Sequence, residues 1–152
     1  MAVQDLVKTL TDVEPDEPYW EDIKQLNLCD RDLDSVHNLE DFCNRLEDLD
    51  LSNNNVAHLE GAPNSIRRLN VRSNALSSLT AWSHLANLQY LDISGNTVDS
   101  LAGLCMLVHL REVRADDNQI SSLDGVMGLD GLLKLSVRRN KLTNVDFEGC
   151  QL

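Results

Sequence analysis

The chain has 152 residues and a formal net charge of −12, which is enough length for one domain. No apolar run is long enough to span a membrane, and residues 1–10 lack the hydrophobic region of a signal peptide. Residues 1–50 hold 15 acidic and 4 basic side chains, so this third excludes a surface for nucleic acid or anionic lipid. The acidity indicates either a polar solubilising cap or a docking site for a basic partner segment.

The first residues predict a small amphipathic element followed by a linker. Val3, Leu6, Val7 and Leu10 are spaced for one apolar face of a helical turn. The acidic, proline-containing segment 11–18 predicts a linker or an extended cover. We therefore expect an acidic N-terminal extension over 1–18 and a second unit over 19–152. Tyr19 and Trp20 are expected to cover the N-terminal edge of the core of that unit, because large amphipathic rings suit half-buried positions.

A single pattern then recurs along the chain. Its copies are IKQLNLCDRDLDSV (23–36), LEDLDLSNNNVAHL (46–59), IRRLNVRSNALSSL (66–79), LQYLDISGNTVDSL (88–101), LREVRADDNQISSL (110–123) and LLKLSVRRNKLTNV (132–145). The pattern L-x-x-L-x-L-x-x-N-x-L, at a spacing of 20 to 23 residues, is typical of leucine-rich repeats. It predicts about six repeats.

Each copy predicts a short strand and a helical return. In the fourth copy, Leu91 and Ile93 should face inward while Tyr90, Asp92 and Ser94 face outward. The return segments have apolar residues three apart, which favours 3₁₀ or short helical turns. We expect a fuller helix over 38–45 and a tight irregular turn around Gly61 and Pro63. The fold class is thus an α/β solenoid, a right-handed superhelix with a parallel concave sheet and short helical or 3₁₀ segments on the convex side.

An asparagine follows five of the six strands. An asparagine amide both donates and accepts hydrogen bonds, so stacked copies can satisfy backbone groups that the turn leaves buried. We expect a structural ladder rather than catalysis. The first copy has Arg31 at this position, so that rung should be irregular. The ladder residues are Asn54, Asn74, Asn96, Asn118 and Asn140.

The sequence offers no catalytic or metal-binding pattern. Cys29, Cys43, Cys105 and Cys150 form no C-x-x-C pair, and no histidine stands at zinc spacing from them. Cys105 lies in an apolar run and is expected to be buried. His37, His58, His84 and His109 have no nucleophile arranged beside them. We expect no enzyme activity, no cofactor and no metal ion, and a reducing compartment.

Partner binding is expected on the concave strand face. Its mixed charge suits a protein or peptide partner better than a nucleic acid or a membrane. Tyr90 is the best single anchor, since tyrosine combines apolar area with a hydroxyl group. The alternative is an ordinary solvated face on which arginine and aspartate pair across neighbouring coils. The candidate residues are Asp48, Asp50, Arg68, Arg72, Tyr90, Asp92, Arg114 and Arg138.

The end of the sequence predicts a longer protein. After Val145 the chain reads DFEGCQL, which provides no polar capping helix for the last coil. We expect the native chain to continue past Leu152.

Several stretches resemble a particular group of these repeats. FCNRLEDLDLSNN, SIRRLNVRSN, NLQYLDISGN, HLREVRADDNQISSLDGV and LDGLLKLSVRRN are similar to the leucine-rich-repeat region of fungal spindle-pole-body scaffolds. Those scaffolds organise the septation initiation or mitotic exit network and are related to animal centriolin. The resemblance implies a non-catalytic, cytoplasmic, cytoskeletal module at the microtubule-organising centre. Its implied partners are a spindle-pole anchor, a small GTPase or a kinase with its co-activator.

Two other functions remain open. The 22-residue repeat also resembles the class found in a regulatory subunit of protein phosphatase 1, which implies a phosphatase-targeting subunit. Some short leucine-rich-repeat proteins are spliceosomal adaptors that hold an RNA-binding protein.

Overall fold

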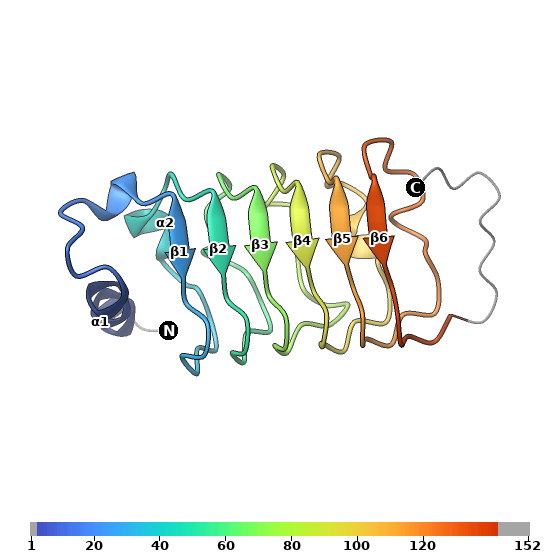
Figure 1. The fold of residues 1–152 in the computed structure, drawn as a ribbon, viewed down its shortest axis with the longest axis horizontal. Helices are drawn as coiled ribbons and strands as arrows, with labels where there is room; N and C mark the ends of the chain where they lie inside the picture. The colour runs from blue at the N-terminus through green and yellow to red at the C-terminus, as the bar shows by residue number, and fades with distance from the viewer. Residues whose placement is uncertain (1–2, 143–152) are drawn as a thin grey trace.

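The computed structural model describes residues 3–142, and within them six three-residue strands form one parallel sheet (Figure 1). Each strand pairs with the next one along the chain, so the sheet order equals the sequence order. The predicted parallel solenoid is confirmed. The strands are β1 (Gln25–Asn27), β2 (Asp48–Asp50), β3 (Arg68–Asn70), β4 (Tyr90–Asp92), β5 (Glu112–Arg114) and β6 (Lys134–Ser136).

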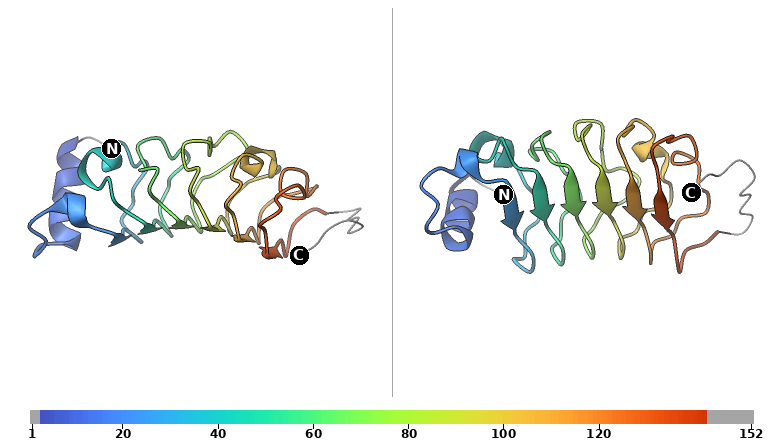
Figure 2. Two further views of the ribbon diagram at one scale, coloured as in Figure 1. Left: turned by 90° about the horizontal axis from the view of Figure 1, so that it is seen from above. Right: turned by 45° about the horizontal axis from the view of Figure 1, so that its top comes forward.

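The return segments lie on the opposite side of the solenoid from the sheet (Figure 2). They contain a short helix α2 (Leu39–Phe42), a 3₁₀ helix η2 (Ala102–Leu104) and turns. The helix expected over 38–45 is therefore real but shorter. Gly61 lies in the expected turn of the third unit with φ of +95°. A Cβ at Gly61 would lie 2.5 Å from the Val36 carbonyl oxygen, so the close approach of two coils requires glycine.

Aliphatic side chains fill the space between the sheet and the returns. One continuous core runs from Leu6 to Leu132, and the central strand leucines Leu49, Leu69 and Leu91 are fully buried. Each such side chain stabilises the fold by about 1.5–3 kcal/mol through apolar burial. Because each coil is too thin to bury its own leucines, stability depends on stacking against the neighbouring coils.

The N-terminal end of this core is covered by helix α1 (Val3–Val13), at the blue end in Figure 1. Leu6 and Leu10 are buried in the same core as the repeats. The 3₁₀ helix η1 (Trp20–Asp22) follows, and the Trp20 ring packs edge-on against Phe42 with 5.6 Å between centroids. Tyr19 is 60% exposed, so the expectation that Tyr19 covers the core edge is wrong, and α1 does this instead.

The asparagines bond backbone groups of the preceding coil. The Asn96 amide nitrogen donates to the Val71 carbonyl of the preceding coil and to the Ile93 carbonyl of its own coil, and its Oδ1 accepts from the N–H groups of Asn74 and Leu76 in the preceding coil. Asn54, Asn96 and Asn118 are buried, whereas Asn74 and Asn140 are half-buried.

The first coil has Arg31 at the ladder position instead of asparagine, so it joins the ladder only through its backbone. The N–H groups of Arg31 and Leu33 donate to Asn54 Oδ1, while the Arg31 side chain is exposed.

Two apolar side chains on the return segments depart from expectation. Cys105 is exposed, because the buried stripe runs through Leu104 and Leu107 and leaves the residue between them outside. Leu79 is 85% exposed, because Thr80 takes the inner place. The Thr80 hydroxyl donates to the Ala57 carbonyl and accepts from the Ser77 N–H, so this buried polar group has hydrogen-bond partners.

The segment 146–152, which carries the expectation of a missing C-terminal cap, lies outside the described residues.

Candidate functional site

The sheet face presents its side chains in rows that cross all six strands. The strand register places the first row in the predicted order: Gln25, Asp48, Arg68, Tyr90, Glu112 and Lys134. Because the strands are parallel and in register, neighbours in a row lie on adjacent coils about 4.8 Å apart. Residues that lie about 22 positions apart in the sequence therefore form one continuous surface.

The middle row consists of the last residue of each strand, and several of its side chains accept hydrogen bonds from the backbone. Asp50, Asn70 and Asp92 each accept a hydrogen bond through Oδ1 from the N–H two residues further along the chain. Asp92 and Ser94 occupy the outward positions that were expected, but Asp92 is only 3% exposed and Ser94 is buried as well, so neither is open to solvent. The Ser94 hydroxyl accepts from the Asp116 N–H, which explains its burial.

In the fifth and sixth coils, the backbone N–H groups after the strand donate to side chains of the preceding coil instead. Arg114 stands in the middle row of β5 and cannot accept a hydrogen bond. Asp116 of the same coil instead accepts from the Ser136 hydroxyl and the Arg138 N–H of the next coil, at 2.6 and 2.7 Å. A shallow hollow of about 250 Å³ lies between β5 and β6, where Lys134 joins Arg114 and Arg138 around it. Glu112 and Asp116 also line the hollow, so it has three basic and two acidic side chains.

Tyr90 lies at the centre of the surface. The guanidinium carbon of Arg68 stands 4.3 Å from the centre of the Tyr90 ring, in a cation–π contact. Partial burial raises the pKa of Tyr90, and the nearby Asp92 carboxylate adds to this rise. The phenol therefore stays protonated and can donate a hydrogen bond to a partner.

Most charges of the candidate set are already paired. Arg68 lies 3.9 Å from Asp48, and Arg72 lies 3.2 Å from Asp92, in both cases on neighbouring coils. Arg114 pairs with Glu112 at 3.0 Å, and this hydrogen bond raises the Arg114 pKa. The Arg68–Asp48 pair is exposed at both ends and contributes only about 0–1 kcal/mol, so a partner can exchange it at little cost. The carboxylates of Asp92 and Glu112 are much less exposed, so their pairs are not exchanged as easily.

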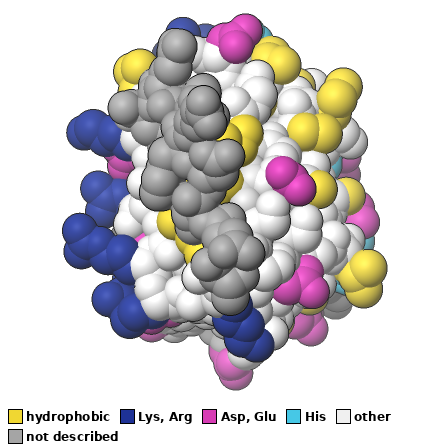
Figure 3. All heavy atoms as spheres, turned by 90° about the vertical axis from the view of Figure 1, so that its right-hand side faces the viewer, with side chains coloured by type: hydrophobic (Ala, Val, Ile, Leu, Met, Phe, Trp, Pro, Cys, Tyr) yellow, Lys and Arg dark blue, Asp and Glu magenta, His cyan; other side chains and the backbone are white. Residues whose placement is uncertain are grey.

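Arg138 differs from the other arginines of the set. Among the described residues its guanidinium group forms no ion pair, whereas its backbone N–H donates to Asp116 and its carbonyl accepts from the Asp117 N–H and the Asn140 side chain. Figure 3 views this end of the molecule and shows Lys and Arg side chains in a column along the side that carries the sheet. This end of the sheet face is therefore suited to a carboxylate-bearing partner.

The candidate residues divide into two kinds. Asp92 is buried, whereas the other seven are half-buried or exposed: Asp48, Asp50, Arg68, Arg72, Tyr90, Arg114 and Arg138. Glu112 and Lys134 belong to the same face and were missing from the predicted set, although the repeat register places them there. Within residues 3–142, no cluster of three or more metal-ligating side chains was found, and no helix there is both long and apolar enough to cross a membrane.

Residues 45–69 match the family profile described as Leucine Rich Repeat. The parallel one-layer sheet, the 20–23-residue register and the asparagine bonds agree with that match. The described part of the chain therefore has the leucine-rich-repeat fold.

A relative gives a more specific comparison. Over 89 residues this leucine-rich-repeat chain is 49% identical to the septation initiation network scaffold protein cdc11 of Schizosaccharomyces pombe. The match covers 59% of this chain and 8% of that protein. The chain therefore corresponds to a small part of its relative's length.

Solved structures confirm the fold alone. An internalin, InlF of Listeria monocytogenes, superposes with a TM-score of 0.75 at 21% identity, over 83% of this chain and 38% of that chain. TLR13, solved as a complex with ssRNA13, superposes with a TM-score of 0.71 at 23% identity, over 90% of this chain and 21% of that one.

Proposed function

We propose that this leucine-rich-repeat chain is a non-catalytic protein-interaction module of a septation-network scaffold. The observation that carries the proposal is the 49% identity to a protein named as a scaffold of that network. Identity at this level over 89 residues exceeds what the repeat pattern alone requires, because that pattern prescribes fewer than half of the positions in each unit.

The sheet face supports a protein partner. It combines a half-buried tyrosine, arginines with exposed guanidinium groups and a hollow between β5 and β6. Tyrosine and arginine are the residues that most often dominate binding energy at protein interfaces. A partner segment with carboxylates opposite Arg138 and an apolar group on Tyr90 would match this surface.

The resemblance also supports a location and a set of partners. The module would act at the spindle pole body and contact a spindle-pole anchor, a small GTPase or a kinase with its co-activator. Such binding would place signalling proteins rather than transform them, which agrees with a face whose charged groups are mostly engaged with one another.

A pull-down from dividing S. pombe cells tests both parts of the proposal. The test variant combines Tyr90→Ala with Arg138→Glu on the sheet face. The matched control combines His109→Ala with Lys8→Glu, which removes a ring and reverses one charge at exposed positions outside the sheet. We leave Arg72 unchanged because its substitution would leave the buried Asp92 carboxylate without its ion-pair partner.

We expect the parent and the control to capture spindle-pole or septation-network proteins, and the sheet variant to lose them. Capture of a phosphatase or a splicing factor in their place would refute the scaffold assignment. Equal capture by a folded sheet variant would show that the binding site lies elsewhere.

A further inference from the structure

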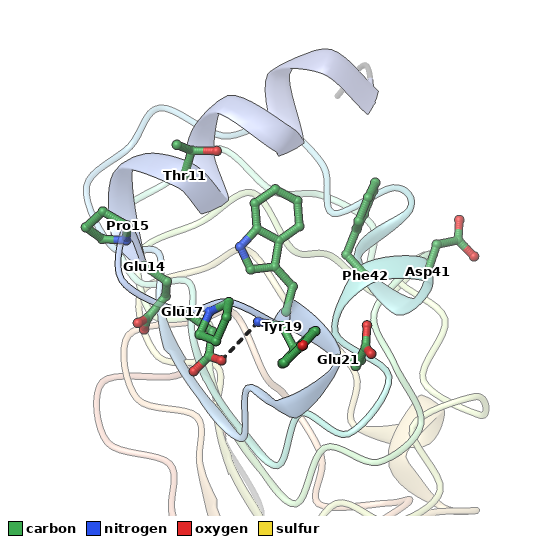
Figure 4. Close-up of a pocket in the computed structure, with 10 residues that line it drawn as sticks. Thr11, Glu14, Pro15, Glu17, Tyr19, Glu21, Asp41 and Phe42 are labelled. Carbon is green, nitrogen blue, oxygen red and sulfur yellow. Dashed lines mark hydrogen bonds between the residues drawn. The ribbon is translucent and has the colours of Figure 1, made fainter.

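A pocket of about 420 Å³ lies at the N-terminal end of the solenoid, away from the hollow between β5 and β6. It is formed where the end of α1, the segment after it, η1 and α2 come together (Figure 4). This volume falls within the range of ordinary ligand pockets, about 300–1,000 Å³. Its lining residues are Thr11, Glu14, Pro15, Glu17, Pro18, Tyr19, Trp20, Glu21, Asp41 and Phe42.

The lining combines aromatic rings with negative charge. Tyr19, Trp20 and Phe42 supply the rings, and the Trp20 and Phe42 rings hold each other in an edge-on contact. Four of the ten lining residues are acidic and none is Lys or Arg. Within residues 3–142 none of the four carboxylates takes part in an ion pair, although several such pairs occur elsewhere in the chain.

The backbone around the pocket is restrained. Pro15 and Pro18 fix the chain direction between α1 and η1, and the Tyr19 N–H donates to Glu17 Oε1 at 3.2 Å. Figure 4 shows Glu17 and Tyr19 joined by this bond, with Phe42 and Asp41 carried by the neighbouring α2. The rings and carboxylates are thus brought together by the fold, since they come from two separate stretches of sequence.

We propose that this pocket binds a lysine or arginine side chain from a basic segment of a protein partner. The hydrocarbon stem of such a side chain packs on aromatic rings, and its cationic head is attracted to ring faces and to carboxylates. An anionic or purely apolar group would leave the carboxylates repelled or desolvated without a partner. The surrounding first third of the chain, with 15 acidic and 4 basic residues, would attract a basic segment over a longer range.

This site is independent of the proposed sheet-face function and has the opposite charge preference. The acidic pocket adjoins the first coil, while the hollow lies between the fifth and sixth strands. One solenoid would then hold a basic segment at one end and an acidic one at the other.

NMR titration of the two tryptophan indole N–H signals tests the pocket directly. Trp20 lines the pocket and Trp82 is buried in the core, so Trp82 serves as an internal control. The probes are five-residue glycine peptides with two lysines, two arginines, two norleucines or two glutamates. We expect saturable shifts of the Trp20 signal with the lysine or arginine peptide, and none with norleucine or glutamate.

Charge-matched variants separate a pocket from general attraction to an acidic protein. Glu17→Gln, Glu21→Gln and Asp41→Asn together remove three charges from the pocket. Their control removes three charges elsewhere, with Glu60→Gln, Asp124→Asn and Asp130→Asn. We expect the pocket variant to bind the basic peptide about tenfold more weakly than the control does, which is a change of roughly 1.4 kcal/mol. Equal weakening by the two sets would overturn the proposal.

A ring variant tests the aromatic contribution. Tyr19 is 60% exposed, so Tyr19→Ala should leave the fold intact, as circular dichroism can verify. We expect binding of the basic peptide to fall about two- to fivefold, the size of one exposed cation–π contact. Unchanged binding in the folded Tyr19→Ala protein, together with shifts of sheet residues instead of Trp20, would place the cation elsewhere.

Discussion

Replacement of Asn96 by alanine should destabilise the protein far more than the same change at Asn74. Both residues belong to the ladder and both accept and donate hydrogen bonds. The two residues differ in the number of backbone groups that would lose their hydrogen-bond partner after the substitution. Comparing the two variants therefore shows how much of the lost unfolding free energy comes from unpaired backbone groups and how much comes from removing any asparagine side chain.

Without the Asn96 amide, three backbone groups lose their hydrogen-bond partner. These are the Val71 carbonyl and the N–H groups of Asn74 and Leu76. The Ile93 carbonyl keeps a second donor, the side chain of Asn118. At about 1–3 kcal/mol for each unsatisfied buried group, and less for the half-buried one, we expect a loss of about 3–5 kcal/mol.

Without the Asn74 amide, only the Val56 N–H is orphaned. The Leu51 carbonyl still accepts from Asn54, and the Arg72 carbonyl still accepts from the Asn53 N–H. The expected loss is about 1–2 kcal/mol.

Urea unfolding followed by circular dichroism measures both losses, with Asn64→Ala at an exposed position as control. Hydrogen exchange at Leu76 adds a local readout, because its N–H loses its acceptor only in the Asn96 variant. Similar losses for Asn96→Ala and Asn74→Ala would refute the argument from orphaned groups.

Further predictions concern the backbone and the thiols. Gly61→Ala should lower the melting temperature by several degrees, since a Cβ at φ of +95° would meet the Val36 carbonyl, whereas Gly128→Ala has open space and should change little. Iodoacetamide should modify exposed Cys105 rapidly in the native protein and Cys43 only after unfolding, as peptide mass spectrometry can show. Burial raises the pKa of Cys43 to about 11, so modification of Cys43 at pH 8 as fast as that of Cys105 would contradict the structure.

The solenoid could be predicted because its signal is repeated. One L-x-L-x-x-N unit is ambiguous, but six in register specify the strands, their order and the row of residues that each strand presents. The exceptions come from single coils. Thr80 displaces Leu79 by satisfying its hydroxyl against the Ala57 carbonyl, and a hydrophobic pattern carries no information on such a bond.

The candidate site was harder to predict because an outward position is not the same as an exposed one. Asp92 occupies an outward strand position, yet its carboxylate bonds a backbone N–H and Arg72 and is buried. The Asp or Asn that recurs at the end of the strands was a sequence signal for this hydrogen bonding to the backbone. The aromatic pocket has no such signal, because α1 and α2 bring together residues that lie about twenty positions apart.

The ladder bonds have a direction along the chain, and this has a consequence for synthesis. Each asparagine bonds backbone groups of the coil before it, as Asn118 does with Ile93 and Val98, and Asn140 with Ala115 and Ile120. A coil emerging from the ribosome therefore cannot complete its hydrogen bonds until the following coil has been translated. Folding of this segment during synthesis should therefore advance coil by coil from α1, with each coil completed only after the next one has left the ribosome.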